Sequence, residues 1–247
     1  MRNPKLTYAI MVAIAAAMIA SSCKKNKLAD SSTSAKKTCK IASATRTSGS
    51  SSATYLLSYD DSDRISTVNY NGPDAYTKHF TYNKKMIYVY TDAGVNSSTD
   101  TITLNTEGFI ASIKESVPNA VYNSVYTFDA NGVLVNSSTQ QDSYPSTTLN
   151  YSFSNGDLLY TSGSDGSKDT LTYYNDRLAT IGDPDQFYQF SYFGAYYYKN
   201  KHLKKTLDAY PYHFTYAYSF DSDDKIVSVF SNYGATADTL NFTYTCP

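Results

Sequence analysis

The sequence predicts an all-β fold: an antiparallel meander of about nine hairpin repeats, strongly curved or closed into a large soluble barrel. Three observations support this prediction. Aromatic residues alternate with small or hydroxyl residues in many segments, which is the two-residue period of a strand with one buried face. Polar turn residues interrupt these segments, and a second β-branched run often follows the turn. The chain also carries 26 tyrosines and 11 phenylalanines, a large aromatic surface that needs a shared interior.

The segment from Tyr216 to Val229 contains one complete repeat. Its aromatic residues occupy alternate positions, the polar run Asp221–Asp224 forms the turn, and the apolar run Ile226–Val229 returns. Units of this kind recur at intervals of 19 to 28 residues, and such a period indicates a repeat architecture. Each unit is anchored on the last aromatic or apolar residue before its turn: Tyr59, Tyr82, Leu104, Phe128, Phe153, Tyr173, Tyr192, Phe220 and Tyr244.

Curvature follows from the number of strands and from their aromatic face. Nine units of two strands would give roughly sixteen to eighteen strands, which is many for an open flat sheet. We therefore expect the tyrosines to face inward with their hydroxyls hydrogen-bonded. The returning strands carry apolar residues three positions apart, such as Ile65 with Val68 and Ile226 with Val229. Strict alternation would put the members of each pair on opposite faces, so we predict recurrent β-bulges or twist there.

The opposite face of the predicted strands carries hydroxyl side chains. A membrane-spanning barrel needs an apolar band facing the lipid, whereas hydroxyl groups suit water or a narrow lumen. This pattern is the reason for expecting a soluble domain. The residues on this face are Ser58, Thr81, Thr103, Thr127, Ser152, Thr172, Ser191, Ser219 and Thr243.

Residues 1–22 are typical of a lipoprotein signal peptide. A charged start precedes the apolar run Tyr8–Ala20, which is too short to span a bilayer, and small residues then precede Cys23. This pattern resembles a lipobox, with Cys23 as the acylated residue. The alternative is an ordinary signal peptide beside an unmodified cysteine. We expect a flexible tether over residues 23–37 and a β-repeat domain over residues 38–247.

The unit Tyr-x-Phe-Asp-x-x-x-Lys-Ile-x-x-Val resembles the tyrosine-aspartate (YD, RHS-type) repeat of large bacterial shell proteins. More closely, the tyrosine-rich chain with its lipobox is similar to a family of secreted bacterial lipoproteins, a domain of unknown function with a porin-like β fold. The resemblance covers Cys39 to Pro247. It implies a protein of the Gram-negative cell envelope, lipid-anchored to the outer membrane, and supplies no catalytic residue. The basic residues after Cys23 favour the periplasmic side.

Two cysteines remain if Cys23 is acylated, namely Cys39 and Cys246 at opposite ends of the predicted β-domain. The oxidising periplasm permits a disulfide between them. Such a bond needs Cα atoms within roughly 7 Å, so it would bring the first and last strands together, as a closed barrel does. The alternative is a pair of buried free thiols.

No cofactor or metal site is predicted. The histidines His79, His202 and His213 lie in different units without the spacing of metal ligands. The acidic turns lack the glycine and distal glutamate of a calcium loop, and the Gly/Ser-rich segment 162–167 lacks a nucleophile elbow. A net charge of −1 gives no electrostatic basis for binding nucleic acid.

An Asp-Thr-aliphatic motif recurs at Asp100, Asp169 and Asp238, at similar places in three units. The motif resembles the acceptor used for O-glycosylation in some Gram-negative phyla. The simpler interpretation, which we favour, is an aspartate that leaves a loop just before threonine and an aliphatic residue begin a strand.

The candidate binding residues are Tyr196, Tyr197 and Tyr198, in a long aromatic connection. Exposed, they would suit a protein or glycan partner; the alternative is a loop folded back to plug or cap the barrel. We predict a membrane-anchored lipoprotein that serves as a non-enzymatic binding or structural module. The alternative is a hydrolase acting on envelope or other polysaccharide, which would need two carboxylates about 5–10 Å apart in a cleft.

Overall fold

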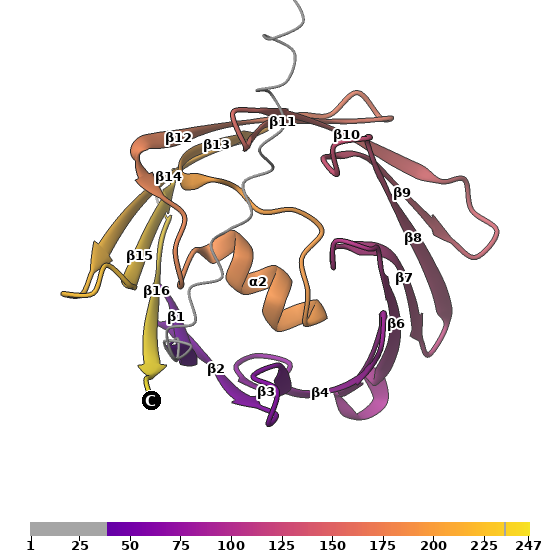
Figure 1. The fold of residues 1–247 in the computed structure, drawn as a ribbon, viewed down its shortest axis with the longest axis horizontal. Helices are drawn as coiled ribbons and strands as arrows, with labels where there is room; N and C mark the ends of the chain where they lie inside the picture. The colour runs from indigo at the N-terminus through magenta and orange to yellow at the C-terminus, as the bar shows by residue number, and fades with distance from the viewer. Residues whose placement is uncertain (1–38, 235) are drawn as a thin grey trace, which may run out of the picture. The chain divides into compact units, whose positions relative to one another are not determined.

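Sixteen antiparallel strands close into a barrel in the computed structural model, which describes residues 39–234 and 236–247 (Figure 1). Each strand pairs with its neighbours in chain order, and β1 pairs with β16. This arrangement confirms the predicted closed meander. The strands are β1 (Lys40–Ser48), β2 (Ser51–Tyr59), β3 (Ile65–Asn71), β4 (Tyr76–Asn83), β5 (Met86–Asp92), β6 (Ser98–Leu104), β7 (Ile110–Val117), β8 (Ala120–Phe128), β9 (Leu134–Gln141), β10 (Thr147–Ser154), β11 (Asp157–Gly163), β12 (Lys168–Leu178), β13 (His202–Ala209), β14 (Tyr212–Phe220), β15 (Ile226–Tyr233) and β16 (Thr236–Thr245).

The predicted signal peptide, the tether and the lipidation residue Cys23 lie outside the described residues. The described part forms one unit, Cys39–Pro247. At its seam, where β1 pairs with β16, a disulfide joins Cys39 to Cys246, and the two Cα atoms are 4.2 Å apart. These are the two cysteines that the sequence predicts to be cross-linked. The bond therefore ties the two ends of the sheet at the place where the barrel closes.

The predicted bulges are present in the returning strands. Between β2 and β3, Ser58 pairs with Thr67 while Tyr59 pairs with Ile65, so one residue of β3 is left over. Because of this extra residue, Ile65 and Val68 both face the interior and both have 0% exposure. The same shift occurs where β6 meets β7, β8 meets β9, β10 meets β11 and β14 meets β15. A bulge after the turn therefore gives the three-residue spacing of the apolar positions.

Interior tyrosines fasten one strand to the carbonyl groups of the strand before it, as the sequence predicts for their hydroxyls. Tyr82 donates its hydroxyl proton to the carbonyl oxygen of Ile65 at 2.9 Å. In this way β4 is held against β3 close to the bulge, and each such bond satisfies a buried hydroxyl. Equivalent bonds run from Tyr59 to Ile41, Tyr173 to Leu158, Tyr218 to Lys204 and Tyr244 to Ile226.

The helix α2 (Pro184–Phe193) corrects the predicted repeat. The anchor Tyr192 belongs to this ten-residue helix and to no strand, so the barrel has eight strand pairs where about nine units were expected. Ser191, predicted on the outer hydroxyl face, is also in α2, is 2% exposed and donates to the carbonyl of Tyr188. Asp183 caps the helix by accepting from the backbone N–H of Gln186, and Gly194 ends it with a φ of 69°.

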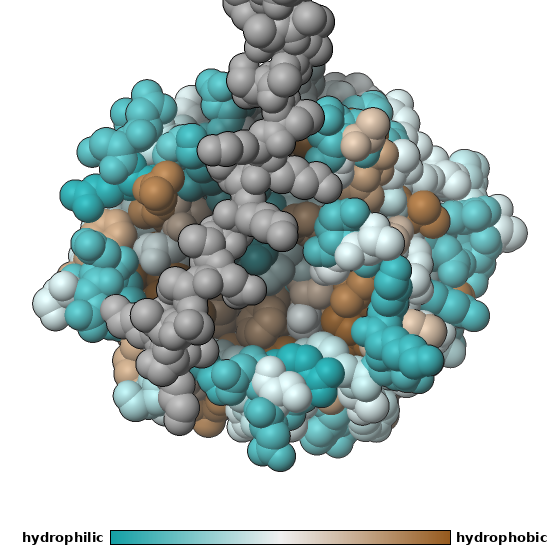
Figure 2. All heavy atoms as spheres, in the orientation of Figure 1, coloured by the Kyte–Doolittle hydropathy of each residue, from teal (hydrophilic) through white to brown (hydrophobic). Residues whose placement is uncertain are grey.

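The helix lies inside the ring of strands (Figure 1). A sixteen-stranded barrel has a lumen too wide for strand side chains alone to fill, and α2 occupies part of that space. Phe187 packs edge-on against Tyr55 of β2 and Phe242 of β16, with ring centroids 5.5 and 5.2 Å away. On the face drawn in Figure 2, hydrophilic residues predominate around the rim of the barrel and hydrophobic ones gather toward its centre. Apart from α2, the described helix is the short η1 (Gly94–Asn96). In residues 39–234 and 236–247, no helix has the length and hydropathy needed to cross a membrane.

Candidate functional site

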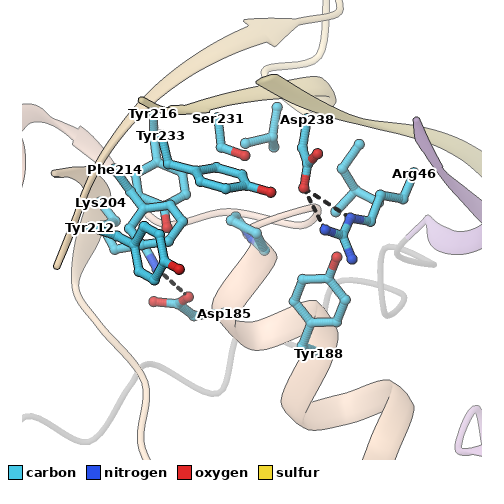
Figure 3. A pocket seen from close by; sticks show the side chains of 13 residues that line it. Arg46, Asp185, Tyr188, Lys204, Tyr212, Phe214, Tyr216, Ser231, Tyr233 and Asp238 are labelled. Carbon is cyan, nitrogen blue, oxygen red and sulfur yellow. Dashed lines mark hydrogen bonds and ion pairs between the residues drawn. The ribbon is translucent and has the colours of Figure 1, made fainter. Parts of the chain in front are cut away.

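A cavity of about 490 Å³ lies between α2 and the part of the barrel wall formed by β13, β14, β15, β16 and β1 (Figure 3). This volume falls within the range of roughly 300 to 1,000 Å³ that small-molecule sites have. We call it the lumen pocket. Its lining combines two ion pairs with a group of aromatic side chains. The residues used below are Arg46, Asp185, Tyr188, Lys204, Tyr216 and Asp238.

The first ion pair joins β1 to β16 across the barrel seam. Arg46 donates from Nε at 3.1 Å and from Nη2 at 2.5 Å, and both bonds go to Oδ2 of Asp238. The hydrogen bond to Asp238 raises the pKa of Arg46. Asp238 is 9% exposed, and its second oxygen, Oδ1, is buried and has no hydrogen-bond partner among residues 39–234 and 236–247. This oxygen is an unused acceptor on a residue that lines the pocket, and its own surface is closed to solvent.

The second ion pair joins the helix to the wall. Lys204 of β13 donates from Nζ to Oδ1 of Asp185 at 2.6 Å, and its Nζ lies 4.5 Å from the ring centroid of Tyr216. Burial disfavours the ammonium form, but the Asp185 carboxylate, together with Tyr216 and Asp183, outweighs it and the pKa of Lys204 is raised. Asp185 sits in the first turn of α2, where the helix dipole also favours a negative charge.

Aromatic faces complete the lumen pocket. Tyr188 projects from α2 toward Arg46, while Tyr216 and Tyr233 project from β14 and β15 on the wall (Figure 3). The ring of Phe214 lies 5.0 Å from that of Tyr233, measured between centroids. Burial raises the pKa of both Tyr188 and Tyr216, so their hydroxyls stay protonated and can donate hydrogen bonds at neutral pH.

A second group of buried polar residues lies on β4, β5 and β6 and consists of Lys78, Thr91 and Asp100, which we call the β4–β6 cluster. Lys78 donates to the carbonyl of Tyr192 at 3.5 Å and forms no ion pair within 4.0 Å in the described chain. Asp100 Oδ1 and Thr91 Oγ1 are buried, and no described residue forms a hydrogen bond with either atom. Burial raises the pKa of Asp100 to about 6 and lowers that of Lys78. The cluster therefore holds charges that are buried but not closely paired.

The predicted binding residues Tyr196, Tyr197 and Tyr198 follow α2 and pack inside the barrel. Tyr197 stacks on Tyr126 of β8 with centroids 5.2 Å apart, and Tyr198 lies edge-on to Phe153 of β10 at 5.8 Å. Their backbone N–H groups donate to Oε1 of Gln189, which holds the segment against the helix. The segment thus has the position expected of a loop folded back into the barrel. Tyr197 and Tyr198 line a separate cavity of about 360 Å³, and their role in binding stays a prediction.

The remaining candidate residues take structural positions. His202 contacts Asp157 through Nδ1 at 2.6 Å, while His79 stacks on Tyr90 and His213 pairs with Asp208. In residues 39–234 and 236–247, no group of three or more His, Cys, Asp or Glu side chains is arranged to hold a metal ion. In the Asp-Thr-aliphatic motifs, Asp100, Asp169 and Asp238 lie one or two residues inside β6, β12 and β16 and pair with neighbouring strands, so these strands begin earlier than the loop-to-strand interpretation expected.

The residues of the lumen pocket were not predicted to form a site, and Asp238 was named only for its motif, although the sequence carries a signal for some of them. Side chains at even spacing from an inward-facing anchor share its face. This rule places Asp238 on the side of Tyr244, Asp100 on the side of Leu104, and Lys78 on the side of Tyr82. A charged residue at an even spacing from an inward-facing anchor therefore indicates a polar site in the interior.

Comparison with known proteins places the chain by its fold. No protein-family model and no curated protein sequence matches it. Among solved structures it is similar to a porin-like protein from Bacteroides uniformis, with a TM-score of 0.63 and 14% identity over 83% of this chain and 96% of that one. It is also similar to a porin-like protein from Bacteroides vulgatus, with a TM-score of 0.56 and 15% identity over 83% and 98%. The chain therefore has the porin-like barrel fold.

Proposed function

We propose that this protein is a lipid-anchored component of the bacterial cell envelope whose plugged barrel is a non-enzymatic binding module. The ligand is a small polar molecule held in the lumen pocket. One observation carries the proposal: α2 lies in the lumen and leaves, against one wall, a pocket that combines ion pairs, an unused carboxylate oxygen and aromatic faces. Such a combination is typical of small-molecule sites.

The way in which the segment around α2 is fastened argues against a barrel that conducts solutes. Its start is held by the N–H of Ile226, which donates to the carbonyl of Ile181 at 3.2 Å. Its middle is held by the N–H of Ile110, which donates to the carbonyl of Tyr196 at 2.8 Å. At its end, Asn200 Oδ1 accepts from the N–H of Leu158 at 3.0 Å. Three attachments to different strands favour a fixed plug.

The outer face of the barrel supports a domain that lies beside the membrane. Exposed apolar side chains such as Tyr90 and Phe230 occur on β5 and β15, but on β4 the outward residues are Thr77, His79, Thr81 and Asn83, and on β16 they include Asn241 and Thr243. A lipid-facing surface would need an apolar band in these places.

Attachment to the membrane would then depend on the lipid at Cys23, so a Cys23→Ala variant should leave the membrane fraction. If that variant stays membrane-bound to the same extent, the anchor lies elsewhere.

The carboxylates of the lumen pocket favour binding over glycoside hydrolysis. Asp185 and Asp238 both line the pocket, but each is held in an ion pair, with Lys204 and Arg46 respectively. A glycosidase of the two-carboxylate type needs one protonated carboxyl group to act as general acid. Asp185 Oδ1 and Asp238 Oδ2 each already accept a hydrogen bond from a cation, so an ion pair would have to open before either carboxyl group could take that role.

A pocket-filling variant tests the proposed function. Ser231 lines the lumen pocket on β15, so Ser231→Trp should occupy the cavity without removing a charge. Ser219→Trp, on the exposed face of β14, is the matched control. We expect a thermal-shift screen against neutral sugars, amino acids, nucleosides and organic acids to find compounds that stabilise the wild type and the control but not Ser231→Trp. A screen in which no compound binds, or in which Ser231→Trp responds equally, contradicts the proposal.

A further inference from the structure

We propose that the lumen pocket takes a neutral saccharide ring, with neighbouring hydroxyl groups of the ring bridging the carboxylate of Asp238 and the guanidinium of Arg46. This inference rests on the proposed function, because it names the chemical class of the ligand for the same pocket. It follows from three features of the lining: its charge balance, its unused hydrogen-bonding groups and its aromatic faces.

The charge balance points to a neutral ligand. The ionised side chains that line the pocket are two cations, Arg46 and Lys204, and two anions, Asp185 and Asp238, and they form two closed pairs. An anionic or cationic ligand would have to open one of these pairs or bury a net charge. Both changes are costly where Lys204 and Asp238 are less than a tenth exposed. A neutral molecule leaves both pairs intact.

The unused hydrogen-bonding groups point to hydroxyls. Asp238 accepts both bonds from Arg46 on Oδ2, so its Oδ1 has no donor in the described chain; this oxygen is closed to solvent, and a ligand reaches it when the Asp238 side chain turns toward the pocket. Arg46 has five N–H groups and directs only two of them to Asp238, and its side chain is 45% exposed. A ligand that satisfies both residues must donate at one atom and accept at the next. Neighbouring hydroxyl groups on a sugar ring provide this combination, because each hydroxyl can do either.

The aromatic faces match the other surface of such a ring. Tyr188 lies on the helix side of the pocket beside Arg46, and Tyr216 and Tyr233 lie on the opposite wall (Figure 3). The C–H groups on the face of a sugar ring are weakly positive and apolar, and the face of an aromatic ring is its negative region. Tyr188 and Tyr216 also keep hydroxyls that can donate to ring oxygens. A saccharide therefore finds polar contacts at its edge and apolar contacts on its face.

A zwitterionic amino acid is the competing neutral ligand. Its carboxylate and ammonium would seek Arg46 and Asp238, but these two side chains already neutralise each other at 2.5 Å. Binding would exchange one closed pair for two new ones and would leave the aromatic faces to the side chain alone. The saccharide uses the groups that the pair leaves over.

Calorimetric titration of the full chain with neutral hexoses, N-acetylhexosamines and their short oligomers tests the inference, with amino acids and uronic acids in parallel. We expect a neutral saccharide to bind, and Asp238→Asn to weaken it at least about tenfold, the loss of one charge-assisted hydrogen bond. Tyr188→Ala should weaken the same sugar. Its matched control is Tyr192→Ala, a tyrosine of the same helix outside the lumen pocket, which should bind normally.

The possible results distinguish a wrong ligand class from a pocket that binds no small molecule. If Asp238→Asn does not fold, Tyr188→Ala still tests sugar binding, because this substitution removes no charge and leaves the ion pair of Arg46 and Asp238 in place. Preferential binding of amino acids or uronic acids, abolished by Ser231→Trp, overturns the saccharide and leaves a binding pocket in place. Sugar binding that both Tyr188→Ala and Asp238→Asn leave unchanged also overturns it. If nothing binds in either panel, the saccharide is excluded and the wider small-molecule screen decides the proposed function.

Discussion

Two walls of the lumen contain the same short motif, but its buried aspartate has an ion-pair partner in one wall and none among the described residues in the other. Asp238-Thr-Leu on β16 and Asp100-Thr-Ile on β6 both direct an aspartate inward and an aliphatic residue two positions later into the core. In the lumen pocket, Asp238 is paired with Arg46 at 2.5 Å. In the β4–β6 cluster, Asp100 has no ion pair within 4.0 Å in the described chain, and burial raises its pKa to about 6.

The difference comes from the neighbouring strands. Asp238 lies opposite Ser48 of β1, and Arg46 of the same strand reaches it from the next inward position. Asp100 lies opposite Val89 of β5 and Glu115 of β7, an apolar and an acidic residue. A motif thus places a carboxylate in the interior, but the strand beside it decides whether the charge is compensated.

Removing the disulfide should have the largest effect, because it acts at the seam that brings Arg46 and Asp238 together. In the chain-entropy model, a disulfide that closes the loop from Cys39 to Cys246 contributes about 4 kcal/mol to stability. The double variant Cys39→Ser with Cys246→Ser should therefore lower the free energy of unfolding by up to that amount. Denaturant titration with and without reductant measures the loss. Peptide mapping should recover Cys39 linked to Cys246, and free thiols at both positions would contradict the bond.

Breaking the ion pair of the lumen pocket should come next. Arg46→Met leaves the carboxylate of Asp238 buried without a partner and should cost about 2 to 3 kcal/mol, less than the roughly 3 to 5 kcal/mol of a fully buried pair because Arg46 is partly exposed. Adding Asp238→Leu should recover most of the loss, since no charge then remains buried. Chemical denaturation of both variants gives the comparison. Equal instability of the single and double variants would mean that packing, and not charge, sets the cost.

In the β4–β6 cluster, by contrast, removing a charge should stabilise the folded protein at neutral pH. The folded-state pKa of Asp100, about 6, is above its unfolded value, so the folded protein binds more protons and loses stability as pH rises from about 4 to 6. Asp100→Asn should flatten this part of the pH profile and raise stability at pH 7 by about 2 kcal/mol. Urea titrations at pH 4, 5, 6 and 7 measure the slope. Asp61→Asn, in an exposed turn, is the control; a slope that survives in Asp100→Asn would refute the assignment.

The smallest expected effect concerns one interior hydroxyl. Tyr82→Phe removes the hydrogen bond to the carbonyl of Ile65 and leaves that buried oxygen without the hydroxyl donor, at a cost of about 1 kcal/mol. Tyr90→Phe, on the exposed face of β5, should change the free energy of unfolding by less than about 0.5 kcal/mol. Thermal unfolding of the pair tests the difference. Identical melting temperatures would show that these bonds add nothing to stability.

Much of the barrel could be predicted because its information is local. Alternation defined the inward face, turn residues marked the hairpins, and the spacing of Ile65 and Val68 predicted the bulge that brings both inside. The helix α2 was missed although its signals are present: Asp183 before Pro184 at the start and Gly194 at the end. Its aromatic residues at positions 188, 190 and 192 alternate as in a strand, and this two-residue period concealed the helix.

The lumen pocket could be predicted only in part, because it depends on contacts between distant segments. Parity places Asp238 in the interior, yet its partner Arg46 comes from the other end of the domain and meets it only when the barrel closes. Asp185 and Tyr188 reach the pocket only because α2 turns into the lumen. No local pattern records either event.

The tyrosine hydroxyl bonds have a consequence for how such a chain can evolve. Each bond joins a unit to the one before it, as from Tyr82 to Ile65 or from Tyr244 to Ile226. Such a bond needs only these two neighbours and does not depend on how many other units the barrel has. Duplication or loss of one unit would therefore keep every remaining bond and change the girth of the barrel by two strands. Related genes of different length could in this way enclose wider or narrower lumens while the segment inside diverges to suit another ligand.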